Sequence, residues 1–314
     1  MRQNSRIRFI VVVCVAMAAA VLMPAAAQAN LIANGDFEAA TTLTNASLTA
    51  ATYGQWLAGT SWAVVDGTDN NFAQYGGAAT DLLVQGALLP TTSCVGAGWK
   101  VKLSFAYQLP EAAEGAPPAA GQAQIAGLNP GGAWNLDGSF VNPTDGQILG
   151  TFTDMTETDP AAWGTYKNAI TLPGAFEALG VGFNLPMVDN VIAEVVAPVS
   201  FKISPTTLNL KSRGKWVTAF ISKPPSCYTL DSINADSILL SVGESSIPAD
   251  WINRHGRKFL LKFDRQALIA MLNGATGAIT LTVSGSFTDG IAFEGQTTLR
   301  VIDPGKKKAP KGGK

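Results

Sequence analysis

Side chains that could carry out catalysis are few in this 314-residue chain. His255 is the only histidine, and it lies in Asn253–Arg257, a polar stretch typical of a turn. The sequence has no serine nucleophile elbow, no paired-histidine or paired-cysteine metal motif and no phosphate-binding glycine loop. A lone histidine in a turn is far more often a surface residue than the base of a Ser-His-Asp triad, which stays the alternative. These observations favour a protein that is not an enzyme.

Carboxylates offer one catalytic route without histidine, because a pair of Asp or Glu residues can hydrolyse a glycosidic bond. Three of the candidate acids fall in segments expected to be loops of an acidic domain, where solvated surface is the ordinary explanation. A polysaccharide-acting enzyme is therefore the third interpretation of the sequence. The candidate acids are Glu111, Glu114, Glu157 and Glu177.

The first thirty residues predict export. An apolar run over 9–23 follows three arginines and precedes alanines that end in Ala27-Gln28-Ala29. This is the pattern of a secretory signal peptide, residues 1–29, cleaved before Asn30. The apolar run is shorter than the roughly 20 residues that span a bilayer, so an uncleaved anchor is the lesser alternative. We therefore expect a secreted, extracellular or cell-surface bacterial protein with no integral membrane segment after cleavage.

Cleavage would leave Cys94 and Cys227 as the only cysteines, one in each half of the chain. In an oxidising compartment they could pair, but connectivity cannot be read from the sequence. Free buried thiols and an inter-domain disulfide are the two alternatives. In either case we expect stability to come mainly from packing.

Charge divides the chain into two halves. Residues 30–197 carry 3 basic side chains against 15 acidic ones, whereas residues 198–303 carry 11 basic and 8 acidic ones. This asymmetry predicts two domains that meet where Val195–Pro198 ends a strand-like run. It also argues against nucleic acid as a partner of the first domain. The Lys-, Gly- and Pro-rich tail, 304–314, is expected to be disordered; its lysines could contact anionic cell-surface polymers, although a solvated tail is the simpler interpretation.

Most of the chain has the pattern of short β-strands separated by Gly, Pro, Asn and Asp clusters. Arg265–Leu272 alone has apolar residues at helical spacing. Many short strands with one short helix predict an all-β fold of two tandem β-sandwiches, one over 30–197 and one over 198–303. Segment 111–120, rich in Ala, Pro and Gly, is expected to be a mobile loop. The predicted strands are 82–89, 99–107, 147–152, 166–172, 178–183, 191–196, 208–210, 216–221, 237–242, 259–263, 279–284 and 297–302.

The first domain opens with the segment Asn30-Leu31-Ile32-Ala33-Asn34-Gly35-Asp36-Phe37-Glu38, and Val188-Asp189-Asn190-Val191 lies near its end. Together with spaced aromatic residues around Trp56, Trp62 and Trp163, these motifs resemble the carbohydrate-binding modules with a galactose-binding-like jelly-roll fold. The resemblance covers residues 30 to about 196, and it implies a jelly roll for the first domain.

In that family a calcium ion often ties the first strand to the last. The resemblance therefore implies a calcium site with Asp36, Glu38 and Asp189 as carboxylate ligands. Ca²⁺ takes six to eight oxygen ligands and tolerates irregular geometry, which suits such a set. The alternative is that Asn34-Gly35-Asp36 makes a turn and that Asp189 bonds nearby backbone amides.

The resemblance also implies glycan binding by exposed aromatic rings that stack on sugar faces, flanked by polar groups that bind hydroxyls. Trp134 is the first candidate, because Asn129–Asn135 is a turn-rich loop that is expected to leave the ring exposed. Tyr53 and Trp56 are the next candidates. The tryptophans in strand-like contexts are expected in the core: Trp62, Trp99 and Trp163.

The second domain contains two further motifs, Ile203–Thr218 and Thr288–Gly295. They resemble an uncharacterised immunoglobulin-like module found at the ends of secreted bacterial proteins. The resemblance implies a spacer or attachment role with no known ligand. Lys211, Arg213 and Lys215 alternate as on one strand face, which is typical of a solvated face.

The leading interpretation is thus a non-catalytic carbohydrate-binding or adhesion protein. The second is a structural surface protein that makes protein–protein contacts without a small ligand. Exposed aromatic rings close to one another would favour the first, and a flat, filled face would favour the second. A cleft with two carboxyl groups roughly 5 to 10 Å apart would favour an enzyme.

Overall fold

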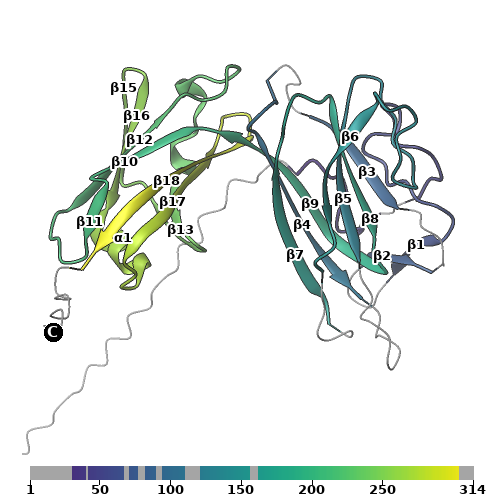
Figure 1. The fold of residues 1–314 in the computed structure, drawn as a ribbon, viewed down its shortest axis with the longest axis horizontal. Helices are drawn as coiled ribbons and strands as arrows, with labels where there is room; N and C mark the ends of the chain where they lie inside the picture. The colour runs from purple at the N-terminus through teal and green to yellow at the C-terminus, as the bar shows by residue number, and fades with distance from the viewer. Residues whose placement is uncertain are drawn as a thin grey trace, which may run out of the picture.

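The computed structural model describes residues 30–39, 42–66, 71–76, 82–89, 94–109, 121–155 and 162–303. Within them the chain is almost entirely β-structure (Figure 1), which confirms the predicted all-β sandwich class. None of the described helices is long and apolar enough to cross a membrane. The predictions that lie outside these residues concern the signal peptide, the 111–120 insertion, the 304–314 tail, Glu111, Glu114 and Glu157.

Nine strands of the described residues belong to the N-terminal half: β1 (Trp62–Asp66), β2 (Asn71–Tyr75), β3 (Leu83–Leu88), β4 (Lys100–Gln108), β5 (Gln122–Leu128), β6 (Gly146–Phe152), β7 (Gly164–Thr171), β8 (Ala178–Asn184) and β9 (Met187–Pro198). The C-terminal half contains β10 (Ser200–Ser204), β11 (Thr207–Asn209), β12 (Trp216–Ser222), β13 (Leu239–Val242), β14 (Ser245–Pro248), β15 (Trp251–His255), β16 (Lys258–Asp264), β17 (Gly277–Ser286) and β18 (Ala292–Ile302). Its helices are the short 3-10 turns η1 (Leu230–Ser232) and η2 (Ala235–Ser237) and the α-helix α1 (Arg265–Leu272), which has the predicted bounds.

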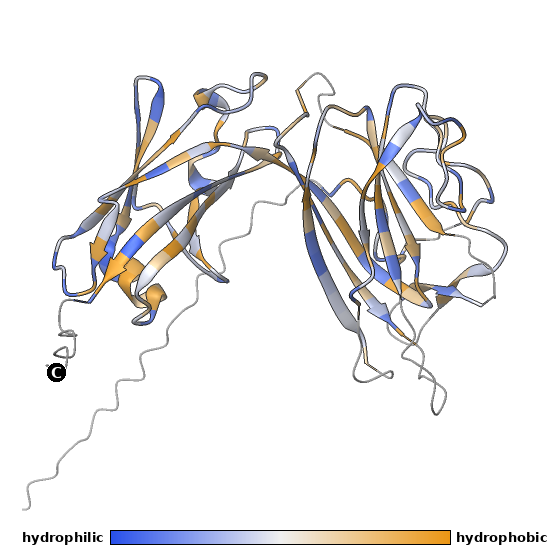
Figure 2. Cartoon of the chain, in the orientation of Figure 1, coloured by the Kyte–Doolittle hydropathy of each residue, from blue (hydrophilic) through white to orange (hydrophobic). Residues whose placement is uncertain are grey.

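Two sheets pack face to face in the N-terminal unit. The first has the order β1-β2-β9-β4-β7, because β9 pairs with β2 on one side and with β4 on the other. The second has the order β3-β8-β5-β6. Val101, Leu103, Phe105 and Tyr107 of β4 are buried and alternate with half-exposed residues, as a strand with one core face requires. Figure 2 shows such alternation as bands along the strands, and the Phe105 ring meets Phe183 of β8 with centroids 4.9 Å apart.

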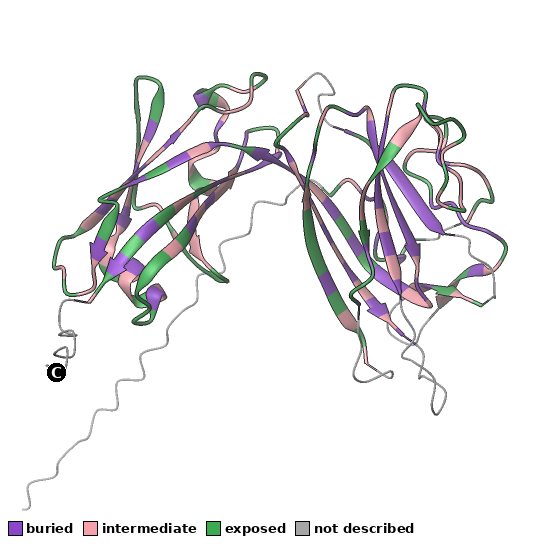
Figure 3. Cartoon of the chain, viewed as in Figure 1, coloured by how far each residue is buried: buried purple, intermediate pink, exposed green. Residues whose placement is uncertain are grey.

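In the sheet β3-β8-β5-β6, the strands β3, β8 and β5 are largely buried on both faces, whereas most of β6 is not buried. Figure 3 shows β8 buried along its length, and Ala178–Phe183 are all buried. One face joins the main core, and the other is covered by Leu48, Leu57 and Trp134, which come from loops. Gly180 faces this cover, and a Cβ added there would lie 2.7 Å from the Trp134 ring. The sheet is therefore the middle layer of the unit.

The C-terminal unit is a second sandwich. One layer has the order β10-β12-β16-β15; the other contains β11, β18, β17, β13 and β14. Helix α1 begins after Asp264, whose carboxylate accepts a hydrogen bond from Ala267 N at 2.8 Å, the usual way to satisfy a helix N-terminus. Leu268 and Leu272 of α1 pack into the core.

The two units share backbone pairing. β9 and β18 pair in parallel over Val196–Pro198 and Ala292–Glu294, so that a 10-stranded sheet runs through the described residues of both units. The predicted boundary between 197 and 198 lies at the end of β9. One hydrophobic core continues across this joint.

Covalent and ionic contacts reinforce the joint. Cys94 and Cys227 form a disulfide with their Cα atoms 5.6 Å apart, so of the two alternatives the inter-domain disulfide is present. Glu294 of β18 lies 2.7 Å from the ammonium group of Lys100 and 2.8 Å from that of Lys102, both on β4. The joint is therefore a packed interface rather than a flexible linker.

Candidate functional site

Residues 30–39 lie along an edge of β9 that is otherwise open between β2 and β18. Leu31 N donates to Ala193 O at 2.8 Å, and Val191 N donates to Gly35 O at 2.8 Å. Gly35 is required by this close approach, because a Cβ there would lie 2.0 Å from Val191 O. Gly35 thus allows residues 30–39 to pack closely against β9. The same segment forms the border of two pockets.

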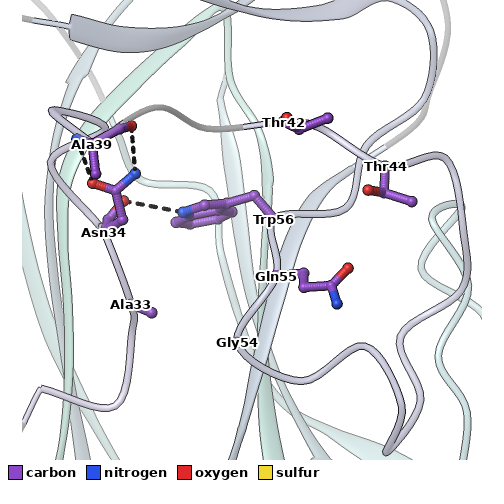
Figure 4. A pocket seen from close by; sticks show the side chains of 8 residues that line it. All are labelled: Ala33, Asn34, Ala39, Thr42, Thr44, Gly54, Gln55 and Trp56. Carbon is purple, nitrogen blue, oxygen red and sulfur yellow. Dashed lines mark hydrogen bonds between the residues drawn. The ribbon is translucent and has the colours of Figure 1, made fainter.

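The first pocket has a volume of about 330 Å³ and is shown in Figure 4. Trp56 lies on one side of it, with its indole Nε1 donating to Asn34 O at 3.1 Å. The Asn34 side chain is bonded in both directions to the backbone of Ala39, at 3.0 Å each. Because Trp56 is only 2% exposed, its ring face is closed to stacking on a sugar, and it instead supports the pocket. Hydroxyl and amide side chains complete the lining: Thr42, Thr44 and Gln55.

The second pocket, of about 390 Å³, lies between residues 30–39 and β9. Asp36 lines it together with the amide side chains of Asn30, Asn34 and Asn190. This is the place where the sequence resemblance puts a calcium ion. Asp36 and Asn190, the neighbour of Asp189, are part of the lining, but Glu38 and Asp189 themselves are not.

Each of the three predicted calcium ligands has a separate hydrogen-bond partner. Asp36 Oδ1 accepts from Glu38 N at 3.4 Å, and Glu38 Oε1 accepts from Asn71 N at 2.8 Å. Asp189 is buried, and its two oxygens accept from the backbone and side-chain nitrogens of Asn190 at 2.7 and 2.8 Å. In the part of the chain that the structure describes, no three His, Cys, Asp or Glu side chains converge on a metal position. The carboxylates therefore do not fit the predicted set as they stand, and calcium binding stays a hypothesis.

Trp134 is fully buried, so the expectation that its loop leaves the ring exposed is wrong. Leu48 N donates to Trp134 O at 2.8 Å, and Trp134 N donates to Leu48 O at 3.0 Å. This short bridge fixes the loop against the outer face of β8, where Gly180 and Gly182 leave room for the indole. Gly180 and Gly182 alternate with larger residues in β8. This alternation is the sequence signal that a bulky side chain packs on that face of the strand.

The other aromatic residues divide between core and surface. Tyr53 is half-buried against the same loop cluster; burial, and to a smaller extent the charge of Glu177, raises the pKa of its hydroxyl. Trp62 and Trp99 are buried, as predicted. Of the three predicted sugar-binding residues, the structure places Trp56 at a pocket, Tyr53 at the edge of the loop layer and Trp134 inside it.

Trp163, predicted to be in the core, is 40% exposed. It comes immediately before Gly164, which starts β7 opposite Tyr107. Because Tyr166 points into the core and side chains alternate along a strand, Trp163 points outward. Its ring meets Phe72 of β2 edge to face, with centroids 5.4 Å apart. Since β9 and β4 separate β2 from β7, the two rings meet across the outer face of these strands.

Polar side chains accompany the Trp163–Phe72 pair. Strand pairing places Gln74 of β2 and Gln108 of β4 on either side of Met187. All three point outward, because their neighbours along each strand include buried core residues. An aromatic pair with one exposed ring, next to two amide side chains, suits recognition of a sugar ring and its hydroxyls.

Of the residues considered for catalysis, the structure describes Glu177 and His255. Glu177 Oε2 accepts a hydrogen bond from Gly131 N at 3.2 Å, in the loop layer of the N-terminal unit. His255 is exposed on β15 opposite Lys258, in the other unit. Neither arrangement assigns a catalytic role to these side chains.

Comparisons with known proteins leave the family open. No protein-family model matches the chain, and no curated protein matches it. Among solved structures, the chain is similar to a DUF4785 family protein from Legionella pneumophila, with a TM-score of 0.31 and 10% sequence identity. The likeness covers 88% of this chain and 69% of that one. So distant a likeness assigns neither family nor function.

Proposed function

We propose that this is a non-catalytic carbohydrate-binding protein of the extracellular space or cell surface. The Trp163–Phe72 pair on the outer face of the N-terminal unit is the observation that carries this proposal. A partly exposed indole next to a second ring offers an apolar, π-rich surface to the C–H face of a pyranose. The amides of Gln74 and Gln108 would bind hydroxyl groups and fix the orientation of the sugar.

We place the glycan at Trp163 rather than in the pocket beside Trp56. The pocket offers hydroxyl and amide groups, but the Trp56 ring is buried and cannot stack. Stacking contributes apolar contact area that a shallow polar pocket lacks, so the exposed pair is the better platform. A galactose-binding-like jelly roll for this unit and an immunoglobulin-like module for the second remain part of the proposal.

The Cys94–Cys227 disulfide supports secretion, because such bonds persist in oxidising compartments outside the cytoplasm. The packed joint between the units favours a second candidate function. A protein whose two sandwiches share a sheet, a core and a disulfide would serve as a rigid spacer at a surface, with no small ligand.

Binding of the purified protein to a panel of neutral glycans, with and without calcium, tests the proposal. Trp163→Ala should weaken binding to any retained glycan by about tenfold, since one stacked ring is removed. Leu88→Ala removes an exposed apolar side chain from β3 of the same unit and should leave the affinity within about twofold. No retention on any glycan would favour the spacer, whereas equal loss of binding in both variants would contradict the placement of the glycan at Trp163. Dependence on calcium would support the predicted site at Asp36, Glu38 and Asp189.

A further inference from the structure

The outer face of the sheet β10-β12-β16-β15 combines lysines with aromatic rings. Figure 1 shows this sheet on the upper side of the C-terminal unit, above β17 and β18. In β12 the buried residues Val217, Ala219 and Ile221 point into the core, so Phe220 points outward. The outward residues of all four strands include Lys202, Trp216, Thr218, Phe220, Trp251, Asn253, His255, Lys258, Leu260 and Lys262.

Strand register places each outward lysine next to a ring. Lys262 lies opposite Trp251, and its Nζ is 4.6 Å from the ring centroid. Lys258 Nζ is 5.6 Å from the centroid of Phe220. These cation–π contacts hold the ammonium groups on the sheet surface while their remaining hydrogen-bond donors face solvent. Trp251 is itself 39% exposed, so part of its ring stays open to a ligand.

Acidic side chains do not neutralise this face. The four strands contain one acid, Asp264, and its carboxylate caps helix α1. Asp250 lies at the margin, next to Trp251, while Asp231 is paired with Arg254. In the other layer of the same sandwich the outward residues include the uncharged Thr280, Thr282, Gln296 and Thr298 and one cation, Arg300. Lys202, Lys258 and Lys262 therefore share one face, on which the one acid of the four strands is engaged with helix α1.

The spacing of the charges fits a polymer. Lys202 and Lys258 lie two strands and two residues apart, about 12 Å, and Lys258 and Lys262 lie four residues apart on one strand, about 13 Å. Such distances are too large for one small anion to bridge, but they match a chain with repeated negative groups. A flat sheet with rings between the charges also suits sugar rings alternating with carboxylates.

We propose that this face binds a linear polysaccharide that carries carboxylate groups. Lys202, Lys258 and Lys262 pair with the carboxylates, and the open part of the Trp251 ring contacts the C–H face of a sugar. The site is separate from the Trp163 surface of the N-terminal unit, and it does not depend on glycan binding there. The acidic N-terminal unit, with 15 acids against 3 basic residues, disfavours a densely charged partner such as duplex DNA.

Titration of the full purified protein with polygalacturonate tests the charges. Lys258→Gln combined with Lys262→Gln should weaken binding about tenfold and flatten its dependence on salt. The matched control is Lys211→Gln combined with Arg300→Gln, which removes the same charge from other exposed positions of this unit. The control should stay within about twofold of the unmodified protein. The lysine-rich segment 304–314 is common to all variants, so its contribution cancels.

The ring is tested separately. Trp251→Ala should weaken binding to polygalacturonate several-fold without changing the salt dependence, whereas Leu88→Ala, at an exposed position of β3, should leave the affinity within about twofold. Circular dichroism and thermal unfolding confirm that each variant folds. Absence of binding, equal loss in the Lys211/Arg300 control, or tighter binding to duplex DNA or to vesicles of anionic phospholipid at the same salt would overturn the proposal. If Trp163→Ala loses neutral glycans but Trp251→Ala loses polygalacturonate, the two sites are independent.

Discussion

The absence of a side chain at Gly180 allows Trp134 to close the outer face of β8. A Cβ at this position would lie 2.7 Å from the indole and 2.9 Å from Leu48, closer than real carbon atoms approach. We predict that Gly180→Ala lowers the free energy of unfolding by about 1–2 kcal/mol, because the indole must leave its packed position. Urea denaturation measures this.

Gly174→Ala is the matched control, since nothing lies within 4 Å of a Cβ added there. It should change the free energy of unfolding by less than about 0.5 kcal/mol. An equal loss in the two variants would show that the intrinsic preference of glycine, and not contact with Trp134, sets the cost.

Two tryptophans show where sequence reasoning stops at the residue scale. Trp134 was expected on the surface because its loop is rich in turn residues, but pairing with Leu48, far away in the sequence, carries it inward. Trp163 was expected in the core, although alternation from the buried Tyr166 places it on the outward side. Composition predicts which side chains are apolar; exposure depends on which distant segment covers them. The exposed pair with Phe72 had no local signal in the sequence.

At the scale of elements, strands β4 and β18 are held together across β9 by Glu294. Burial alone would raise the pKa of Glu294, but the hydrogen bonds and charges of Lys100 and Lys102 outweigh it and lower that pKa. Glu194 of β9, also near Lys102, has its pKa raised by burial. The ion pairs of Glu294 therefore depend on the arrangement of the three neighbouring strands β4, β9 and β18.

Because the pKa of Glu294 falls on folding, its carboxylate stabilises the protein at pH values above the pKa of the unfolded chain. This contribution is lost as the pH falls through the lower pKa of the folded state. We predict that Glu294→Gln costs about 1–2 kcal/mol at neutral pH and progressively less in acid. Urea denaturation across pH 2 to 7, roughly the range in which carboxylates titrate, measures the difference.

The exposed Glu244 of the same unit provides the control for this pH series. Glu244→Gln should change stability by less than about 0.5 kcal/mol at any pH in the series. A cost of Glu294→Gln that stays constant down to the acid end would mean that packing, rather than charge, holds β4 to β18.

The sequence predicted most elements but not their partners. Helix α1 has the predicted bounds, and many predicted strands lie within observed ones. Periodicity identifies a strand because its signal is local. Pairing of β9 with β18 joins residues about 100 positions apart, and no pattern in either strand specifies it. The tandem arrangement follows from local signals and was predictable. The continuous sheet depends on the pairing of β9 with β18 and was not.

On the scale of the whole molecule, the shared sheet, core and disulfide make the relative position of the two units part of the fold. The proposed glycan surface at Trp163 and the proposed polyanion surface at Trp251 are then held at a fixed separation. Two ligand chains bound at these surfaces would be tied together by a body without a flexible linker, which suits a role in a matrix or at a cell surface.

The disulfide offers the sharpest test of this rigid joint. It closes a loop with a sequence separation of 133, for which chain entropy predicts a stabilisation of up to about 5 kcal/mol. We predict that Cys94→Ser combined with Cys227→Ser lowers the melting temperature but preserves the far-ultraviolet circular dichroism, because β9–β18 pairing and the common core remain. Reductant should bring the unmodified protein to the melting temperature of the double variant and leave the variant unchanged. If reductant has no effect on either protein, the cysteines do not pair in solution, and the joint depends on packing and on Glu294 alone.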